Sequence, residues 1–470
     1  MIKQLIIKNE TLISALIVLC ILVFSFVLKN QNILSILILL ILMFVTFLSL
    51  INFRIGVLVL ASSSSLNGFV RMYDLENPIT ASFIFLLACL LLSILLVIFV
   101  SKNKHTIPRA SSNFVAMYAL ILCLLVIYII SGSVSLFSFF LYLREYFVPL
   151  LVFFIFLHVL KKDLYLFNKI IIFIVFPAAI VAIVNIYHYF FGLDIVFNQY
   201  VKGNMSPSIR SLFGFPMPRL NHILGLGGAA TGGLFYMLVS ILSLLVVKHQ
   251  KRFLSILLLT SSVILALASI LTISSSVILL VLFFVFWLFI FKLSYHPSRF
   301  RLLIFITAMP FLLLILFYPF GINESYDSIF NYAFFGFIGQ FLNNFQDFTF
   351  LDHIFGLGLS LPGKGGELKG AIQVLADRWI FTLYVQFGLI GFVVFLIFWA
   401  YPILKIIFNK KKLCTNLESI LFVCGFIIIG SFAVAHNVAI IHRLITPILM
   451  LAFATFYVAF YTSHVKKIPQ

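Results

Sequence analysis

Charged residues are scarce in this chain of 470 residues, at 9% of the sequence, and only 13 residues are acidic. Because 63% of the residues are apolar, there is too little polar surface for a soluble globular protein. The five cysteines lie in or beside apolar runs without metal-ligand spacing, which argues against a disulfide framework or a zinc site. The composition therefore predicts a polytopic membrane protein.

Apolar runs long enough to cross a bilayer recur along the chain, separated by short polar breaks. They predict an all-α fold class, a polytopic membrane helical bundle of about 14 transmembrane helices, with 12 or 13 as alternatives. The count is open because the run 56–70 is short and the pair at 253–291 is split only by Thr272 to Ser276. The expected spans are 11–28, 33–51, 56–70, 81–100, 114–131, 137–160, 167–189, 223–247, 253–271, 275–291, 302–319, 379–404, 417–434 and 439–461.

Basic residues in the short loops predict the orientation of the chain. Most of the 31 gather on one side, among them Arg54, Lys162 and Lys169, so that side and both termini are expected in the cytoplasm. The first run lacks a small-residue cleavage site and is expected to stay as an anchor. The net charge of +18 reflects this topology signal, so nucleic-acid binding is not expected. The expected organisation is a transmembrane region over 1–319 with an outer loop at 190–222, a large extracytoplasmic loop over 320–378, and transmembrane helices over 379–470.

Arginine is favoured over lysine among the basic residues expected to face outward. A guanidinium matches phosphate oxygens bidentately, so this bias favours phosphate recognition, with anchoring of helix ends as the alternative. Arg144 lies about 10 Å below the outer end of its span, where it needs a polar interior or a partner. Arg71 is set aside, because Asp74 and Glu76 are close enough to pair with it. Five arginines are expected to converge on one outward-opening cavity: Arg144, Arg210, Arg219, Arg378 and Arg443.

The longest polar interruption runs from Gly321 to Gly391 and is expected to form the roof of an active site. At its end the chain re-enters the membrane with Asp377 beside Arg378. Carboxylates and imidazoles can act as general bases, so Asp377, Asp352 and His353 are the candidate catalytic residues. For Asp377 the alternative is a helix cap, and Asp352 with His353 could be an ordinary polar pair in a loop.

Four short motifs carry a resemblance to a known family. Ile354-Phe355-Gly356-Leu357-Gly358 looks like a Phe-Gly-x-Gly motif, and Asp377 to Gly391 looks like a loop-to-helix re-entry. Arg210 to Phe215, with Pro216 and Asn221, looks like a loose version of an Arg…Gly-x-(Phe)-x-(Asn/Pro)-Asn element. Leu271 to Ser276 is similar to a Leu-Thr-x-Ser-Arg turn, with Ser275 where an arginine often stands. In these features the chain resembles the Wzy-type O-antigen polymerases and the related O-antigen ligases. Asp377 stands where ligases commonly carry a histidine, which favours a polymerase.

The resemblance implies a GT-C-like fold in the bacterial inner (plasma) membrane and a role in lipopolysaccharide biosynthesis. The implied reaction is a metal-independent glycosyl transfer at the periplasmic face, from undecaprenyl diphosphate to a lipid-linked repeat unit. Arginines would stabilise the leaving diphosphate, and with no Asp-x-Asp pair in the sequence neither metal nor other cofactor is expected. The expected partners are undecaprenyl-diphosphate-linked oligosaccharide units and membrane lipid, with a chain-length regulator protein as a further candidate. An O-antigen ligase acting on a lipid A core, and a lipid-linked oligosaccharide flippase, are the alternatives.

Overall fold

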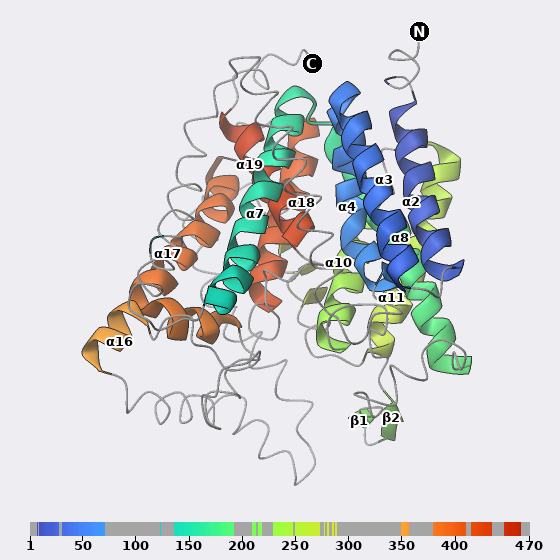
Figure 1. The fold of residues 1–470 in the computed structure, drawn as a ribbon. Helices are drawn as coiled ribbons and strands as arrows, with labels where there is room; N and C mark the ends of the chain where they lie inside the picture. Colours follow the sequence, from blue (N-terminus) through green and yellow to red (C-terminus); the bar gives the residue numbers. More distant parts are fainter. Residues whose placement is uncertain are drawn as a thin grey trace. The chain divides into compact units, whose positions relative to one another are not determined.

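The protein, seen in a computed structural model, is almost entirely helical over the residues that the structure describes. These are residues 7, 9–27, 31–70, 123, 136–191, 209–212, 215–218, 229–247, 250–272, several positions between 277 and 288, 349–356, 379–409, 415–434 and 446–461. The helices and strands, drawn in Figure 1, are α2 (Glu10–Val27), α3 (Gln31–Ile51), α4 (Phe53–Val70), α7 (Leu136–Lys162), α8 (Leu166–Phe191), β1 (Ile209–Leu212), β2 (Phe215–Pro218), α10 (Ala229–Val247), α11 (Arg252–Leu271), α16 (Phe350–Phe355), α17 (Trp379–Asn409), α18 (Thr415–Val434) and α19 (Thr446–Tyr461).

Each long helix overlaps a run expected from the sequence. Three segments of the described part are long and apolar enough to cross a membrane, namely Leu166–Phe191, Arg252–Leu271 and Phe387–Phe408. The structure is thus compatible with a membrane protein. The expected spans 81–100 and 302–319, and all of 114–131 except Cys123, lie outside the described residues.

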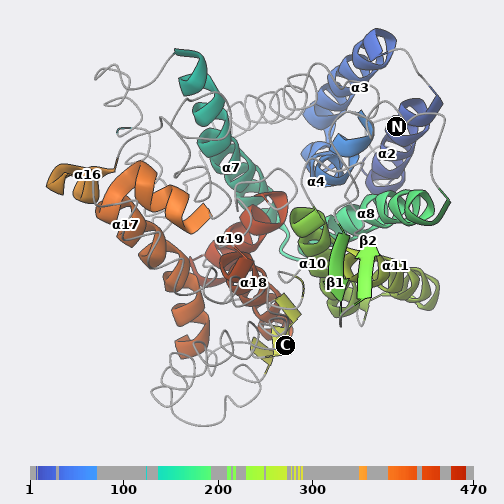
Figure 2. The same ribbon diagram turned by 90° about the horizontal axis from the view of Figure 1, so that it is seen from below.

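The chain divides into two compact units, of which the first comprises residues 1–112, 147–277 and 441–470. In this unit α2 and α3 pack against α4, and α8 lies between that group and the α10–α11 pair (Figure 2). Polar side chains join the apolar helices across these contacts. Ser62 Oγ donates to the Phe173 carbonyl oxygen at 2.8 Å, and Asn185 Nδ2 donates to Tyr236 Oη at 2.6 Å. Hydrogen bonds of this kind between apolar helices are typical of membrane proteins.

Small residues allow α10 and α11 to approach closely. Ser243 Oγ donates to the Leu258 carbonyl oxygen at 2.6 Å, and Ser269 Oγ to that of Gly233 at 2.7 Å. A Cβ added at Gly233 would overlap the Thr272 hydroxyl, so this crossing requires glycine. The pair is packed by the small-residue contacts that are typical of membrane helices.

A short hairpin departs from the all-α expectation. Strands β1 and β2 pair antiparallel with Arg210 opposite Met217 and Leu212 opposite Phe215, so Phe213 and Gly214 link the two strands. A two-residue link is the commonest connection in a hairpin. The hairpin lies within the expected outer loop at 190–222.

The second unit comprises residues 113–146 and 278–440. Two tryptophan side chains of this unit donate hydrogen bonds to the backbone of α18. Trp287 Nε1 donates to the Phe422 carbonyl oxygen at 2.9 Å, and Trp399 Nε1 of α17 donates to that of Ile428 at 2.8 Å. The membrane-length part of α17 is therefore hydrogen-bonded to α18.

Helix α17 is kinked at Gly388, whose φ is 62° and ψ −165°. Its apolar membrane-length segment begins at Phe387 and ends at Phe408, whereas the sequence was expected to enter the membrane at residue 379. The turns from Trp379 to Phe387 form a separate helical segment before the kink. The helix itself begins at residue 379, as expected, and where it enters the membrane stays a prediction.

Candidate active site

The short helix that carries His353 packs against α17 at its kink. His353 lies on α16, which contacts α17 within the second unit (Figure 1). The imidazole Nδ1 is 2.8 Å from the phenol oxygen of Tyr384, and both side chains are half-buried. Phe392 meets the Tyr384 ring edge-on, with ring centroids 6.3 Å apart. The Tyr384 ring is thereby held where it can orient the imidazole.

Glycine is required at position 388 for two independent reasons. Its backbone angles fall in a region that is essentially restricted to glycine. A Cβ there would overlap the Ile354 carbonyl oxygen and lie 2.5 Å from the Gly356 amide nitrogen. Gly356, directly after α16, also has a positive φ, of 83°. The structure thus packs one glycine motif, Ile354 to Gly356, directly onto the other, Gly388 to Gly391.

The bond between His353 and Tyr384 determines what the imidazole can do. When Nδ1 carries the proton and donates to the phenol oxygen, Nε2 is the unprotonated nitrogen that a general base requires. When the phenol donates instead, Nε2 carries the proton and can donate a hydrogen bond to a substrate. Either arrangement fixes the orientation of the ring, and histidine is the commonest side chain in proton transfer.

Four of the expected site residues lie on described elements. Arg144 lies on α7, Arg210 on β1 opposite Met217, and Asp352 and His353 on α16. Of these, the structure describes the side chain of His353 alone. The catalytic candidate Asp377 and the arginines at 219, 378 and 443 lie outside the described residues. Convergence of the five arginines stays a prediction.

Tyr384 was missed in the sequence. It stands four residues before Gly388, and positions four apart share one face of a helix. The spacing would have predicted Tyr384 as a site residue only if the docking of α16 on this helix face had been known.

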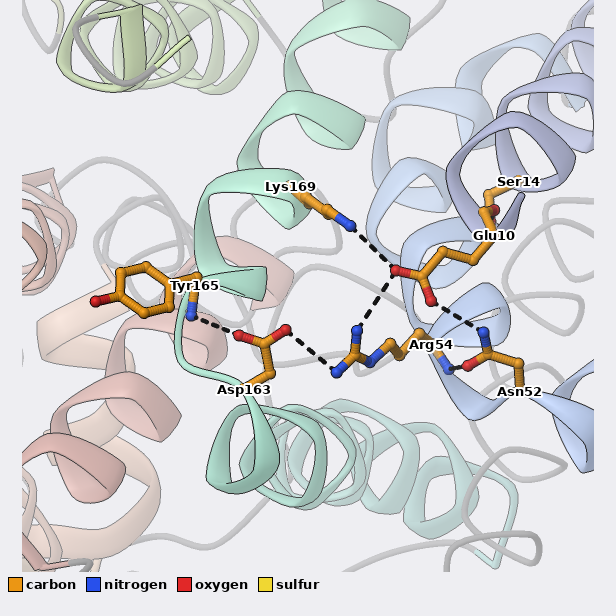
Figure 3. A network of polar contacts seen from close by, with 7 residues as sticks. All are labelled: Glu10, Ser14, Asn52, Arg54, Asp163, Tyr165 and Lys169. Atoms are coloured by element: carbon orange, nitrogen blue, oxygen red, sulfur yellow. Dashed lines mark hydrogen bonds and ion pairs between the residues drawn. The ribbon is translucent and has the colours of Figure 1, made fainter. Parts of the chain in front are cut away.

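A second polar cluster lies in the first unit, at the ends of α2, α4 and α8 (Figure 3). The Glu10 side chain is only 8% exposed, and one of its oxygens, Oε1, accepts a hydrogen bond from Lys169 Nζ at 3.1 Å. The same oxygen lies 3.5 Å from Arg54 Nη1. Arg54 in turn pairs with Asp163, with Nη2 and Oδ2 3.2 Å apart. Sequence reasoning used Arg54 and Lys169 only as topology signals, and the structure places both at one carboxylate.

Two short turns build this cluster. Asn52 alone separates α3 from α4, and its Oδ1 accepts from the Arg54 amide at 3.1 Å, which caps α4. Its Nδ2 donates to Glu10 Oε2 at 2.9 Å. In the turn between α7 and α8, Asp163 Oδ1 likewise accepts from the Tyr165 amide at 3.0 Å. Arg54 links the two turns, so the helix ends and the ion pairs depend on each other.

The environment of Glu10 favours its charged form. Burial raises the pKa of this carboxyl, but hydrogen bonds from Asn52 and Lys169 and the charges of Lys169 and Arg54 lower it, and the lowering is the larger effect. Glu10 precedes the first expected span. The carboxylate is therefore ionised and holds its basic partners at neutral pH.

Across the described ranges, no three His, Cys, Asp or Glu side chains gather into a set that could hold a metal ion. Comparisons of the chain with protein-family models, with curated proteins and with solved structures found no match.

Proposed function

We propose that the protein is a surface-polysaccharide polymerase of a bacterial plasma membrane, a bundle of about 14 spans with both termini in the cytoplasm. It transfers the growing glycan from undecaprenyl diphosphate onto a lipid-linked repeat unit. One observation carries this proposal: the packing of Ile354 to Gly356 onto Gly388, which brings His353 to Tyr384 at the start of a membrane-length segment. The two segments that meet are those in which the sequence resembles the polymerases.

In the proposed reaction a sugar hydroxyl of the acceptor attacks the anomeric carbon of the donor. A general base takes the hydroxyl proton while the bond from the anomeric carbon to the diphosphate oxygen breaks. His353, oriented by Tyr384, is the best-placed candidate base among the described residues, with Asp352 and Asp377 as the other candidates. The diphosphate departs with the bonding electrons, and cationic groups stabilise its developing charge. The five arginines expected from the sequence have that role.

Variants of the histidine–tyrosine pair test the proposal. The assay uses purified protein and lipid-linked repeat units extracted from source cells that lack it, with glycan length followed over time. His353→Ala should slow polymerisation by about 10²–10⁴-fold. Tyr384→Phe should slow it by about five- to tenfold, because only one orienting hydrogen bond is lost. Tyr401→Phe, which removes a phenol further along the same helix, is the matched control and should leave the rate unchanged.

Equal rates for the wild type and His353→Ala would remove His353 from the mechanism. Deleting the protein from its source cells distinguishes the alternatives. Loss of a polymerase leaves single repeat units on the surface lipid. Loss of a ligase would leave polymer on undecaprenyl diphosphate, and loss of a flippase would leave intermediates facing the cytoplasm; either result would refute the proposal.

A further inference from the structure

A cavity of about 200 Å³ lies in the first unit, beside the cluster that Glu10 organises. The turn between α3 and α4 forms one wall with Asn52 and Arg54, and the last two turns of α7 form the other with His158 and Lys162. A single water needs only about 10–15 Å³ of such space. The cavity can therefore hold a group much larger than one water.

The polar lining of the cavity is basic. Arg54, His158 and Lys162 contribute to it, and no acidic side chain does. Lys162 is exposed, and it forms no ion pair with any residue of the described part of the chain. Arg54 is 35% exposed and keeps donors beyond those facing Glu10 and Asp163, since a guanidinium has five N–H groups. The cavity therefore offers an anion the planar N–H donors of a guanidinium and the charge of an ammonium group.

Apolar groups complete the lining. Phe53 and Val159 also line the cavity. Helix α3, whose last residue also lines the cavity, exposes Met43, Phe47 and Leu50 along one face. A cavity with basic and apolar walls at the end of an exposed apolar helix face fits a lipid headgroup better than a free ion. The positive-inside pattern places this end of α7 at the cytoplasmic leaflet, where anionic lipids are concentrated.

We propose that this cavity binds the phosphate group of an anionic lipid, held by the Arg54 guanidinium and the Lys162 ammonium. A lipid headgroup and inorganic phosphate both carry the phosphate group that these side chains would bind. The apolar lining favours the lipid as its source. The site lies in the first unit, and neither His353 nor Tyr384 takes part in it. The proposed lipid site goes beyond the proposed function, and either can be refuted without the other.

Thermal unfolding of the full-length protein in a neutral detergent tests the site. The probes are dihexanoyl phosphatidylglycerol, its zwitterionic counterpart dihexanoyl phosphatidylcholine, and inorganic phosphate, each titrated to obtain an apparent Kd. Phosphatidylglycerol should stabilise the wild type at lower concentration than either other probe. Lys162→Gln should weaken its binding by about fivefold, and Lys162→Arg should retain it. Lys251→Gln, which removes an exposed lysine away from the cavity, should bind like the wild type.

Each contrary outcome overturns the proposal in a distinct way. Equal responses to phosphatidylglycerol and phosphatidylcholine would show that the anionic charge is not recognised. Inorganic phosphate acting at the same concentration as the lipid would show an adventitious ion only. Equal weakening by Lys162→Gln and Lys251→Gln would assign the effect to diffuse surface charge.

Discussion

Replacing Gly388 by alanine should separate α16 from α17. The backbone angles at this position, 62° and −165°, cost a residue with a side chain about 1–3 kcal/mol. The new Cβ would also lie 2.5 Å from the Gly356 amide nitrogen, where ordinary contact begins at 3.4 Å. The α16 segment must then move by about 1 Å, beyond the range of the His353–Tyr384 hydrogen bond, which contributes about 0.5–1.5 kcal/mol.

The total expected loss of stability for Gly388→Ala is thus about 1.5–4.5 kcal/mol. Reversible unfolding in mixed micelles of a neutral detergent and dodecyl sulfate measures it, and polymer length in cells measures the loss of activity. Gly430→Ala is the matched control in the same unit. Its Cβ would lie 2.7 Å from the flexible end of Leu280 and in ordinary contact with the Phe426 ring, so this variant should stay close to the wild type in both assays. If the two alanine variants unfold at the same detergent composition, the close packing of α16 on Gly388 is refuted.

Further substitutions at Arg144, Arg378, Asp377 and Glu10 test the site and the cluster. Arg144→Lys and Arg378→Lys should each shorten the polymer on a glycan gel although the charge is kept, because an ammonium cannot reproduce the bidentate fork; near-normal long chains from both would indicate helix anchoring instead. Asp377→Asn should abolish polymer while the protein still inserts, because the amide retains capping but not basicity; a wild-type yield would reduce Asp377 to a helix cap. Glu10→Gln should lower the free energy of unfolding by about 1–2 kcal/mol at neutral pH, whereas Ser14→Ala, which loses one bond to the Glu10 carbonyl oxygen, should have a smaller effect; the reverse order would contradict the cluster as described. Folding lowers the pKa of Glu10, so the contribution of this carboxylate to the free energy of unfolding is present above the ordinary carboxyl pKa of 4.5 and is lost as the pH falls below it. The stability difference between wild type and Glu10→Gln should therefore shrink in acid. A constant difference would show that the charge of Glu10 does not matter.

The positions of the helices could be predicted from the sequence because an apolar run of bilayer length has few conformations other than a helix. The run expected at 253–271 is α11, which begins one residue earlier at Arg252. The break between the runs 33–51 and 56–70 falls at Asn52, since an asparagine favours a helix start. The kink in α17 could not be predicted, because the residues on both sides of Gly388 are apolar and hydropathy is unchanged across it.

The polar contacts could not be predicted, because they depend on how distant segments pack. Glu10 and Lys169 lie 159 positions apart, and they meet only because α2 and α8 both pack against α4. His353 was expected as a candidate base, but its partner Tyr384 depends on the docking of α16. The hairpin was missed because its strands have four residues each and β2 contains two prolines, which cannot donate to a sheet.

The single-residue connection at Asn52 determines where this chain can accept foreign sequence. One inserted residue would turn α4 by about 100° about its axis, which would direct Arg54 away from Asp163 and Ser62 away from Phe173. The two residues that follow Asp163 before α8 leave equally little freedom. Epitope tags or reporter domains placed at either turn would disrupt the register of the first unit. Mapping the membrane topology of this protein by inserted reporters therefore has to avoid both turns, although hydropathy marks them as natural insertion sites.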